Sequence, residues 1–252
     1  MPTQPQPARP RYQQIADELR HAIETGKFLP GAKIPGENQI MSQYEVARNT
    51  ARQALAVLRD QGLTEARKGS GIYVRAFRPI RRNAVSRLSQ QQWGSGKSIW
   101  AADIDDRPLT TVDVEVVEVD APEHIAAAMK LPNRARVWRR SRTFVVEGEP
   151  VNRAVSYLPS DLVAGSRITE VDTGPGGTYA RLAELGHKPI RFREEIRVRM
   201  PMPAEVEALQ LPPATPVILV ARTAIDESGR VVEVNEMAMN SSRYILEYDF
   251  TS

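Results

Sequence analysis

Apolar positions in the first part of the chain recur at the three- and four-residue spacing of amphipathic helices. Residues 11–25 follow this spacing, and Gly26 stands where such a helix ends. A shorter run of the same kind covers residues 37–44, and a third covers 48–61 before Gly62. The pattern therefore predicts three successive helices. Their inward positions are Tyr12, Ile15, Ala16, Leu19, Ala22, Ile23, Ile40, Met41, Ala51, Ala54, Leu55 and Leu58.

Two short strand-like runs follow the third helix, at residues 63–66 and 72–75. Residues 67–71 between them read RKGSG, so the turn is basic and rich in glycine. Glycine lets such a turn adopt positive φ and bring its backbone close to another molecule. Three helices followed by a hairpin form the layout of a winged helix-turn-helix, which we expect over residues 11–75.

The pattern changes after residue 75. Residues 76–98 are polar and basic without sustained periodicity, so we expect a linker there. Across residues 99–252, alternating apolar and polar positions predict an α+β domain built on an antiparallel sheet. The expected strands are 111–119, 137–146, 150–158, 192–200, 216–226, 231–239 and 245–250, and the expected helices are 122–129, 179–185 and 204–209.

Composition excludes several classes of protein. The chain has 252 residues, enough for two domains that each bury a core. It has no cysteine, which excludes disulfides, thiolate metal sites and cysteine nucleophiles. No apolar run approaches the length that crosses a bilayer, and residues 1–10 lack the apolar segment of a signal peptide. We therefore expect a disordered tail over residues 1–10 and a cytoplasmic protein with no membrane partner.

Charge is divided unevenly along the chain. Residues 1–82 contain 14 Lys and Arg against 7 Asp and Glu, a balance of +7, and residues 83–252 contain 20 against 24, a balance of −4. A basic domain joined to a mildly acidic remainder is typical of a polyanion-binding module attached to a domain of another kind. Chance clustering is the alternative. A structural nucleoid protein would be basic throughout, which this chain is not.

Polar side chains occupy the outer face of the third predicted helix. Because its apolar stripe faces inward, Arg48 and Arg52 project together, one turn apart. Arginine can read guanine through two hydrogen bonds, and asparagine or glutamine can read adenine. The alternative is an ordinary solvated helix face. With the glycine-rich turn added, the candidate contacts to double-stranded DNA are Arg48, Asn49, Thr50, Arg52, Gln53, Lys68, Gly69 and Gly71.

Residues 12–74 resemble the DNA-binding domain of the GntR family of transcriptional regulators. YQQIADELRHAIETGKFLPGAKIPGENQI resembles its first helix and the turn after it, VARNTARQALAVLRDQGL its recognition helix, and KGSGIYV its wing. The resemblance implies a sequence-specific regulator, most often a repressor, that works on the nucleoid at a two-fold operator. Asn38 stands where many members have a DNA-contacting arginine, so the operator sequence is not implied.

The remainder of the chain, from about residue 100, resembles the HutC branch of that family, whose C-terminal domain is called UTRA. The similar segments are RRSRTFVVEGEPVNRAVSYLP, GGTYARLAELG, EEIRVRMPMPAEVEALQLP and PVILVARTAIDESGRVVEVNEMAMNSSRYILEYDF. This resemblance implies a chorismate-lyase-like α+β fold, a homodimer, and a pocket for a small-molecule effector.

Arg140 and Arg142 alternate along an expected strand, so both side chains leave the same face. Two guanidinium groups placed in this way can clamp a carboxylate or a phosphate, and matching arginines do so in sugar-phosphate-binding relatives. The alternative is an exposed pair that forms ion pairs with Glu147 or Glu195. An anionic effector is therefore the candidate ligand. The resemblance adds three further candidate pocket residues, Tyr179, Glu233 and Tyr244.

Motifs for catalysis or cofactor binding are weak. Residues 94–98 (GSGKS) end like a P-loop, but Gln91 stands where that motif requires glycine. The histidines are scattered and lack the spacing of metal ligands. No pair of acid and base residues has convincing spacing, although the fold that the resemblance implies is shared with a lyase. We therefore expect a regulator that is not an enzyme and uses no cofactor or metal.

Overall fold

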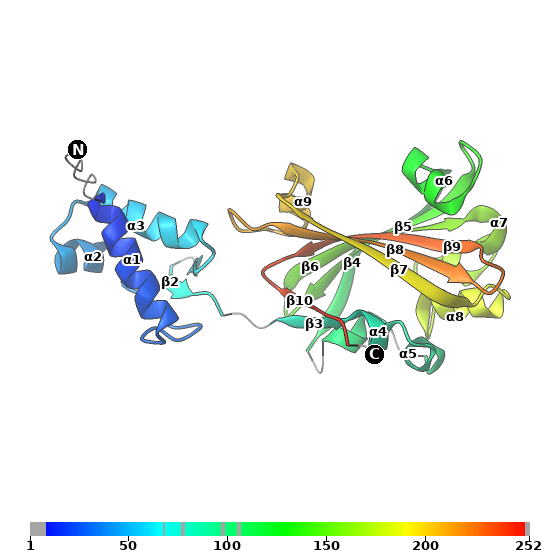
Figure 1. Cartoon of the computed structure of the whole chain (residues 1–252), viewed down its shortest axis with the longest axis horizontal. Helices are drawn as coiled ribbons and strands as arrows, with labels where there is room; N and C mark the ends of the chain where they lie inside the picture. The colour runs from blue at the N-terminus through cyan, green and yellow to red at the C-terminus, as the bar shows by residue number, and fades with distance from the viewer. Residues whose placement is uncertain (1–8, 68, 77–78, 97–98, 105–106, 250–252) are drawn as a thin grey trace, which may run out of the picture. The chain divides into compact units, whose positions relative to one another are not determined.

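The computed structural model describes residues 9–67, 69–76, 79–96, 99–104 and 107–249, and the chain forms two compact units (Figure 1). The first unit ends at residue 78, and the second begins at Pro79. Most of the expected tail, residues 1–8, lies outside the described residues, and the first helix begins at Arg11. None of the helices in the described part of the chain has the length and apolar character needed to span a bilayer.

The first unit is a three-helix bundle with a hairpin. Its elements are α1 (Arg11–Glu24), α2 (Glu37–Tyr44), α3 (Arg48–Asp60), β1 (Thr64–Arg67) and β2 (Gly71–Val74). The two strands pair antiparallel, with Arg67 opposite Gly71 at the turn. The predicted winged helix-turn-helix is therefore confirmed. The helices and hairpin enclose one apolar core, made of Ile15, Ala16, Leu19, Ile34, Ile40, Ala51, Ala54, Leu55, Leu58 and Val74.

The second unit is built on a six-stranded antiparallel sheet with the order β4-β5-β6-β9-β8-β7. Its strands are β4 (Leu109–Asp120), β5 (Arg136–Val146), β6 (Glu149–Pro159), β7 (Pro189–Arg199), β8 (Val217–Asp226) and β9 (Val231–Asn240). Gly148 and Gly229 have φ values of +82° and +83° in the turns of the β5–β6 and β8–β9 hairpins, where other residues would be strained. The predicted α+β domain with an antiparallel sheet is confirmed.

Short elements cover both faces of this sheet (Figure 1). On one face lie α6 (Glu123–Met129) and α9 (Pro203–Ala208). On the other lie β3 (Ile80–Asn83), α4 (Ala84–Arg87), α5 (Gln90–Gly94) and β10 (Tyr244–Glu247), and β3 pairs with β10 in parallel. The remaining elements are η1 (Ala101–Asp103), α7 (Ser160–Val163), η2 (Arg167–Thr169) and α8 (Gly177–Glu184).

The linker that we expected over residues 76–98 is largely absent from the structure, which corrects the sequence analysis. Residues 80–94 form β3, α4 and α5 as part of the second unit, which therefore begins at Pro79 rather than at residue 99. Each of these elements has only four or five residues, too few to show a period. Two of their buried side chains are arginines, Arg82 and Arg87, so the segment has the composition of an exposed linker although it is packed.

Candidate nucleic-acid interface and ligand pocket

Helix α3 turns its polar residues away from the core. Arg48 and Arg52 are exposed, and each contacts the first turn of α2. Arg48 Nη2 donates to Asn38 Oδ1 at 3.5 Å, and Arg52 Nε donates to Glu37 Oε1 at 3.3 Å. The Arg52 side chain is 65% exposed, so this weak ion pair leaves the guanidinium accessible. The other candidates on α3 are the exposed Asn49 and Gln53 and the half-buried Thr50.

The N-terminus of α3 adds a second feature that suits DNA. Ala47 is the N-cap residue, and its side chain makes no hydrogen bond to the helix. The N–H of Thr50 donates to the carbonyl oxygen of Ala47, whereas those of Arg48 and Asn49 have no preceding helical carbonyl and keep their capacity to donate. The helix dipole places partial positive charge there. Phosphate groups bind at such helix ends.

The hairpin turn keeps its glycines exposed. Gly69 and Gly71 have φ values of +73° and +124°, which explains why glycine stands at both positions. Arg67 donates two hydrogen bonds to Glu65, at 2.9 and 3.0 Å, and lies 4.3 Å from the centre of the Tyr73 ring. Lys68, the remaining candidate in this turn, lies outside the described residues.

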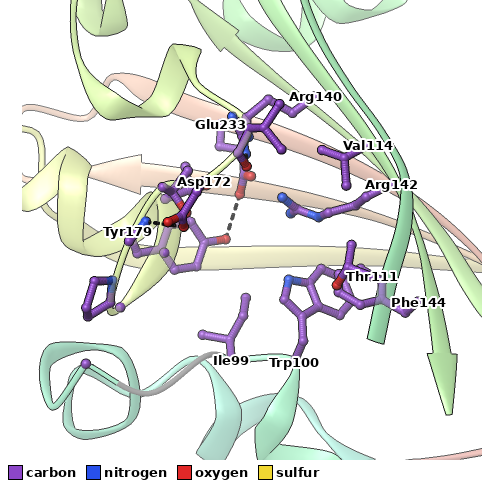
Figure 2. Close-up of a pocket in the computed structure, with 18 of the residues that line it drawn as sticks. Ile99, Trp100, Thr111, Val114, Arg140, Arg142, Phe144, Asp172, Tyr179 and Glu233 are labelled. Atoms are coloured by element: carbon purple, nitrogen blue, oxygen red, sulfur yellow. Dashed lines mark hydrogen bonds between the residues drawn. The ribbon is translucent and has the colours of Figure 1, made fainter. Parts of the chain in front are cut away.

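The second unit contains a cavity of about 510 Å³ (Figure 2). Strands β4, β5, β8 and β9 form one side of the cavity, and the loop before α8 together with residues near η1 forms the other. Four of the five expected effector residues line this cavity, namely Arg140, Arg142, Tyr179 and Glu233. These four residues come from three separate segments, β5, α8 and β9, which the fold brings together.

Tyr179 and Glu233 form a buried polar pair at one end of the cavity. Tyr179 Oη donates to Glu233 Oε2 at 2.7 Å, and Arg222 Nη2 lies 3.7 Å from the same oxygen. The side chains of Arg222 and Glu233 are each 1% exposed. Burial raises the pKa of Tyr179, which keeps its hydroxyl protonated as the donor in this pair. Arg222 already balances the charge of Glu233.

Arg142 has no such counter-charge. Its guanidinium points into the cavity, in the direction of Tyr179 and Glu233 (Figure 2). Nη2 donates to Ser156 Oγ at 3.4 Å, and among the described residues no carboxylate lies within ion-pair distance. Burial lowers the pKa of Arg142, and the charge of Glu233 offsets only part of that effect. A largely buried cation without a paired anion favours an anionic ligand.

Arg140 lines the same cavity, but its two terminal nitrogens donate to backbone carbonyls. Its Nη1 donates to the carbonyl oxygens of Ile168 and Glu170, and its Nη2 donates to that of Val171 at 3.0 Å. Burial lowers the pKa of Arg140 to about 10, and the charge of Arg142 adds to the effect. Arg140 thus holds the loop beside the cavity, and the two arginines that were expected to act as a clamp have different contacts.

Tyr244, the fifth expected effector residue, does not line this cavity. It lies on β10 opposite Ile80 of β3 and packs in an apolar cluster with Ile104 and Phe144. Burial raises the pKa of Tyr244, as expected for a phenol in the core. Its position is explained by packing between β10 and the sheet.

The cavity residues that the sequence analysis missed include Trp100 and Arg222. Trp100 lies two residues after the segment that was interpreted as a linker. Arg222 carried a usable signal, because it stands between Val220 and Ala224 on the buried face of β8. A charged residue on an apolar strand face indicates either a buried ion pair or a site. Within the described residues, no three His, Asp or Glu side chains are grouped as metal ligands.

The comparisons with known proteins match this architecture. Residues 11–74 match the family model described as bacterial regulatory proteins, gntR family, and residues 106–245 match that of the UTRA domain. The HTH-type transcriptional regulator SCO4628 of Streptomyces coelicolor is 29% identical, over 97% of this chain and 94% of that protein. The transcriptional repressor NagR of Bacillus subtilis is 23% identical, over 93% and 92% respectively.

A solved structure shares the fold. The crystal structure of PhnF from Mycobacterium smegmatis superposes with a TM-score of 0.60 at 24% identity, over 94% of this chain and 99% of that one. The UTRA match covers more than half of the chain, and the winged helix precedes it. The chain therefore belongs to the GntR family of bacterial regulators that carry a UTRA effector domain, and it is a DNA-binding transcriptional regulator rather than an enzyme.

Proposed function

We propose that this regulator is a repressor of the HutC branch that binds a two-fold operator as a homodimer on the nucleoid. A small anion in the cavity of the second unit changes its affinity for that operator. The unpaired guanidinium of Arg142 is the observation that carries the effector part of this proposal. The similar protein NagR bears the name of a repressor, which supports that direction of regulation.

The DNA part of the proposal rests on α3. Arg48 and Arg52 are exposed, lie one turn apart, and are held only by weak contacts from α2. In a helix-turn-helix, the N-terminal residues of the recognition helix reach base edges in the major groove. Two such helices related by two-fold symmetry read two half-sites, which is why a homodimer fits the proposal.

Arg48→Ala and Arg52→Ala are each expected to weaken binding to the operator by about 1–3 kcal/mol, with smaller losses on random DNA. The operator is first isolated by selection from a random DNA pool, and it should be an inverted repeat. Arg59→Ala is the matched control, because Arg59 is an exposed arginine in the last turn of the same helix. Equal losses on the operator and on random DNA would assign Arg48 and Arg52 to phosphate contacts alone.

The effector part of the proposal concerns charge in the cavity. Arg222 pairs with Glu233, and Arg140 is held by backbone carbonyls, whereas Arg142 has only the hydroxyl of Ser156 as a hydrogen-bond acceptor among the described residues. A carboxylate or phosphate beside it would form charge-assisted hydrogen bonds in a site where water competes little. The Tyr179–Glu233 pair then offers polar groups to the remainder of the ligand.

A thermal-shift screen of small carboxylates and phosphates tests this assignment. A binder at one hundred times its Kd should add about 2.7 kcal/mol to stability. Arg142→Ala should remove that stabilisation and the response of operator binding, a coupling of about 1–3 kcal/mol, while operator affinity without effector stays unchanged. Arg139→Ala is the matched control, because Arg139 lies next to this site on β5 but pairs with Glu115. A neutral effector, or a normal response by Arg142→Ala, would refute the assignment.

A further inference from the structure

Trp100 contacts both the cavity and the beginning of the second unit. Its indole lines the cavity and stacks on Phe144, with ring centroids 4.1 Å apart and planes inclined by 24°. Three guanidinium carbons also lie near its ring, those of Arg87 at 4.8 Å, Arg142 at 5.5 Å and Arg222 at 5.9 Å. Arg142 and Arg222 line the cavity, whereas Arg87 belongs to α4 and lies outside the cavity wall.

Arg87 has few other contacts to hold it. Its side chain is 1% exposed, and Nη1 donates to Asp103 Oδ2 at 2.5 Å. Within the described residues, Nε and Nη2 of Arg87 have no hydrogen-bond partner. The position of its guanidinium therefore depends on Asp103 and on the face of Trp100.

Like charge connects Arg87 to the cavity. Burial lowers the pKa of Arg87 to about 10 despite Asp103, and the charges of Arg82 and Arg222 add to the effect. Burial also lowers the pKa of Arg142, and the charge of Arg222 acts on that group too. The charge of Arg222 therefore acts on both Arg142 and Arg87. Since all three guanidinium carbons lie near one indole, a change of charge at Arg142 alters where the Arg222 guanidinium rests, and thereby how strongly it repels Arg87.

The same segment contacts the cavity at a second place. Gly176 N, in the loop before α8, donates to the carbonyl oxygen of Gly96 at 2.9 Å. A Cβ on Gly176 would lie 2.8 Å from the carbonyl oxygen of Trp93, so backbone packs closely on backbone there. The Trp93 ring meets Tyr179 edge-on, with centroids 6.2 Å apart. Residues 80–96 are therefore packed against the cavity from two sides.

We propose that Arg87 and Trp100 transmit the charge state of the cavity to residues 80–94, the segment through which the second unit joins the first. An anion beside Arg142 relieves the repulsion between Arg142 and Arg222, so that the Arg222 guanidinium shifts away from Arg87, and Arg87 then packs more firmly on Trp100 and Asp103. This inference deepens the proposed effector function and rests on it for its biological meaning. The charge link itself can be measured without any ligand.

Hydrogen exchange of the full chain tests the link. Arg142→Met removes the charge that a bound anion would neutralise, and it should slow amide exchange in residues 84–94 about fivefold. Arg142→Lys keeps the charge and should leave exchange there as in the wild type. Helix α6, on the opposite face of the sheet, is the internal control and should not change in either variant. Equal behaviour of the methionine and lysine variants in residues 84–94 would overturn the proposal.

A second pair of changes tests whether Arg87 carries the effect. Arg87→Met combined with Asp103→Leu removes both members of the buried ion pair, so no unpaired charge remains to unfold the protein. In that background, Arg142→Met should no longer slow exchange in residues 84–94. A persistent effect would show that another route connects the two places and would overturn the role of Arg87.

An anion titration separates this inference from the proposed function. Inorganic phosphate and sulfate, compared with sodium chloride at equal ionic strength, should slow exchange in residues 84–94 of the wild type as Arg142→Met does. If Arg142→Met slows exchange but phosphate and sulfate bind elsewhere, the charge link stands and the anion assignment fails. If the ions protect β5 and the loop before α8 but not residues 84–94, the anion assignment stands and the charge link fails.

Discussion

Replacing Arg82 with methionine is expected to lower the free energy of unfolding of the second unit by about 3–5 kcal/mol. The Arg82 side chain is 0% exposed and donates two hydrogen bonds to Glu194 of β7, one of them from Nη1 to Oε2 at 2.8 Å. Methionine fills similar space but leaves the buried carboxylate without its counter-charge. Chemical unfolding followed by tryptophan fluorescence reports on this unit alone, because Trp93, Trp100 and Trp138 all lie in it.

Its neighbour Arg81 supplies a matched control. Arg81 Nη1 lies 3.0 Å from Glu247 Oε2, but the two side chains are 64% and 42% exposed. Arg81→Met should therefore cost less than about 1 kcal/mol. Adding Glu194→Leu to Arg82→Met should restore most of the lost stability, since no unpaired charge then stays buried. Similar losses in the two single variants would mean that the buried pair is not the cause.

The effect of Arg82→Met should also depend on pH. Burial by itself would raise the pKa of Glu194, but the hydrogen bonds and charge of Arg82 hold that pKa below its ordinary value of 4.5. Because the folded pKa is the lower one, the stabilisation is complete above the unfolded value and is lost as pH falls through the folded value. In Arg82→Met the effect of burial dominates, so the pKa of the unpaired Glu194 should lie above 4.5 and the variant should gain stability as pH falls toward that value. The difference in stability between wild type and Arg82→Met should therefore begin to shrink above pH 4.5 and shrink further below it.

Local signals explain what the sequence predicted well. In the first unit, the apolar spacing gave α1, α2 and α3 to within about one residue at each end. In the second unit, the β5–β6 and β8–β9 hairpins followed from alternation on both sides of a glycine turn. The same alternation placed Arg140 and Arg142 on one face of β5, and both do line the cavity.

Long-range contacts explain what the sequence did not predict. Strand β3 is ordered by parallel pairing with β10, where Ile80 lies opposite Tyr244 near the other end of the chain. Strand alternation in β5 could not reveal that carbonyls of a distant loop occupy Arg140. Trp100 lies close to residues 80–94, whose polar composition does not indicate that they are packed against the sheet. In each case the partner is far away in sequence, so no periodic pattern records it.

A fragment that begins at Pro79 is expected to fold, whereas one that begins at Ile99 is not. The shorter fragment lacks the buried side chains of Ile80, Leu88 and Trp93, which are 2%, 8% and 3% exposed. Each large apolar side chain contributes about 1.5–3 kcal/mol on burial, and a whole domain is stable by only about 5–15 kcal/mol. The shorter fragment also leaves Glu194 and Asp103 buried without Arg82 and Arg87.

Circular dichroism and chemical unfolding of the two fragments measure this difference. The fragment from Pro79 should unfold cooperatively, and extending it back to Arg75 should not change its stability, because the first unit ends at residue 78. The fragment from Ile99 should show no cooperative transition, since loss of β3 also leaves β10 without the strand that pairs with it. Cooperative unfolding of the Ile99 fragment at the same midpoint would show that residues 79–98 are a linker after all. In that case the buried ion pairs of residues 79–98 with β7 and η1 would contribute little to the free energy of unfolding of the second unit.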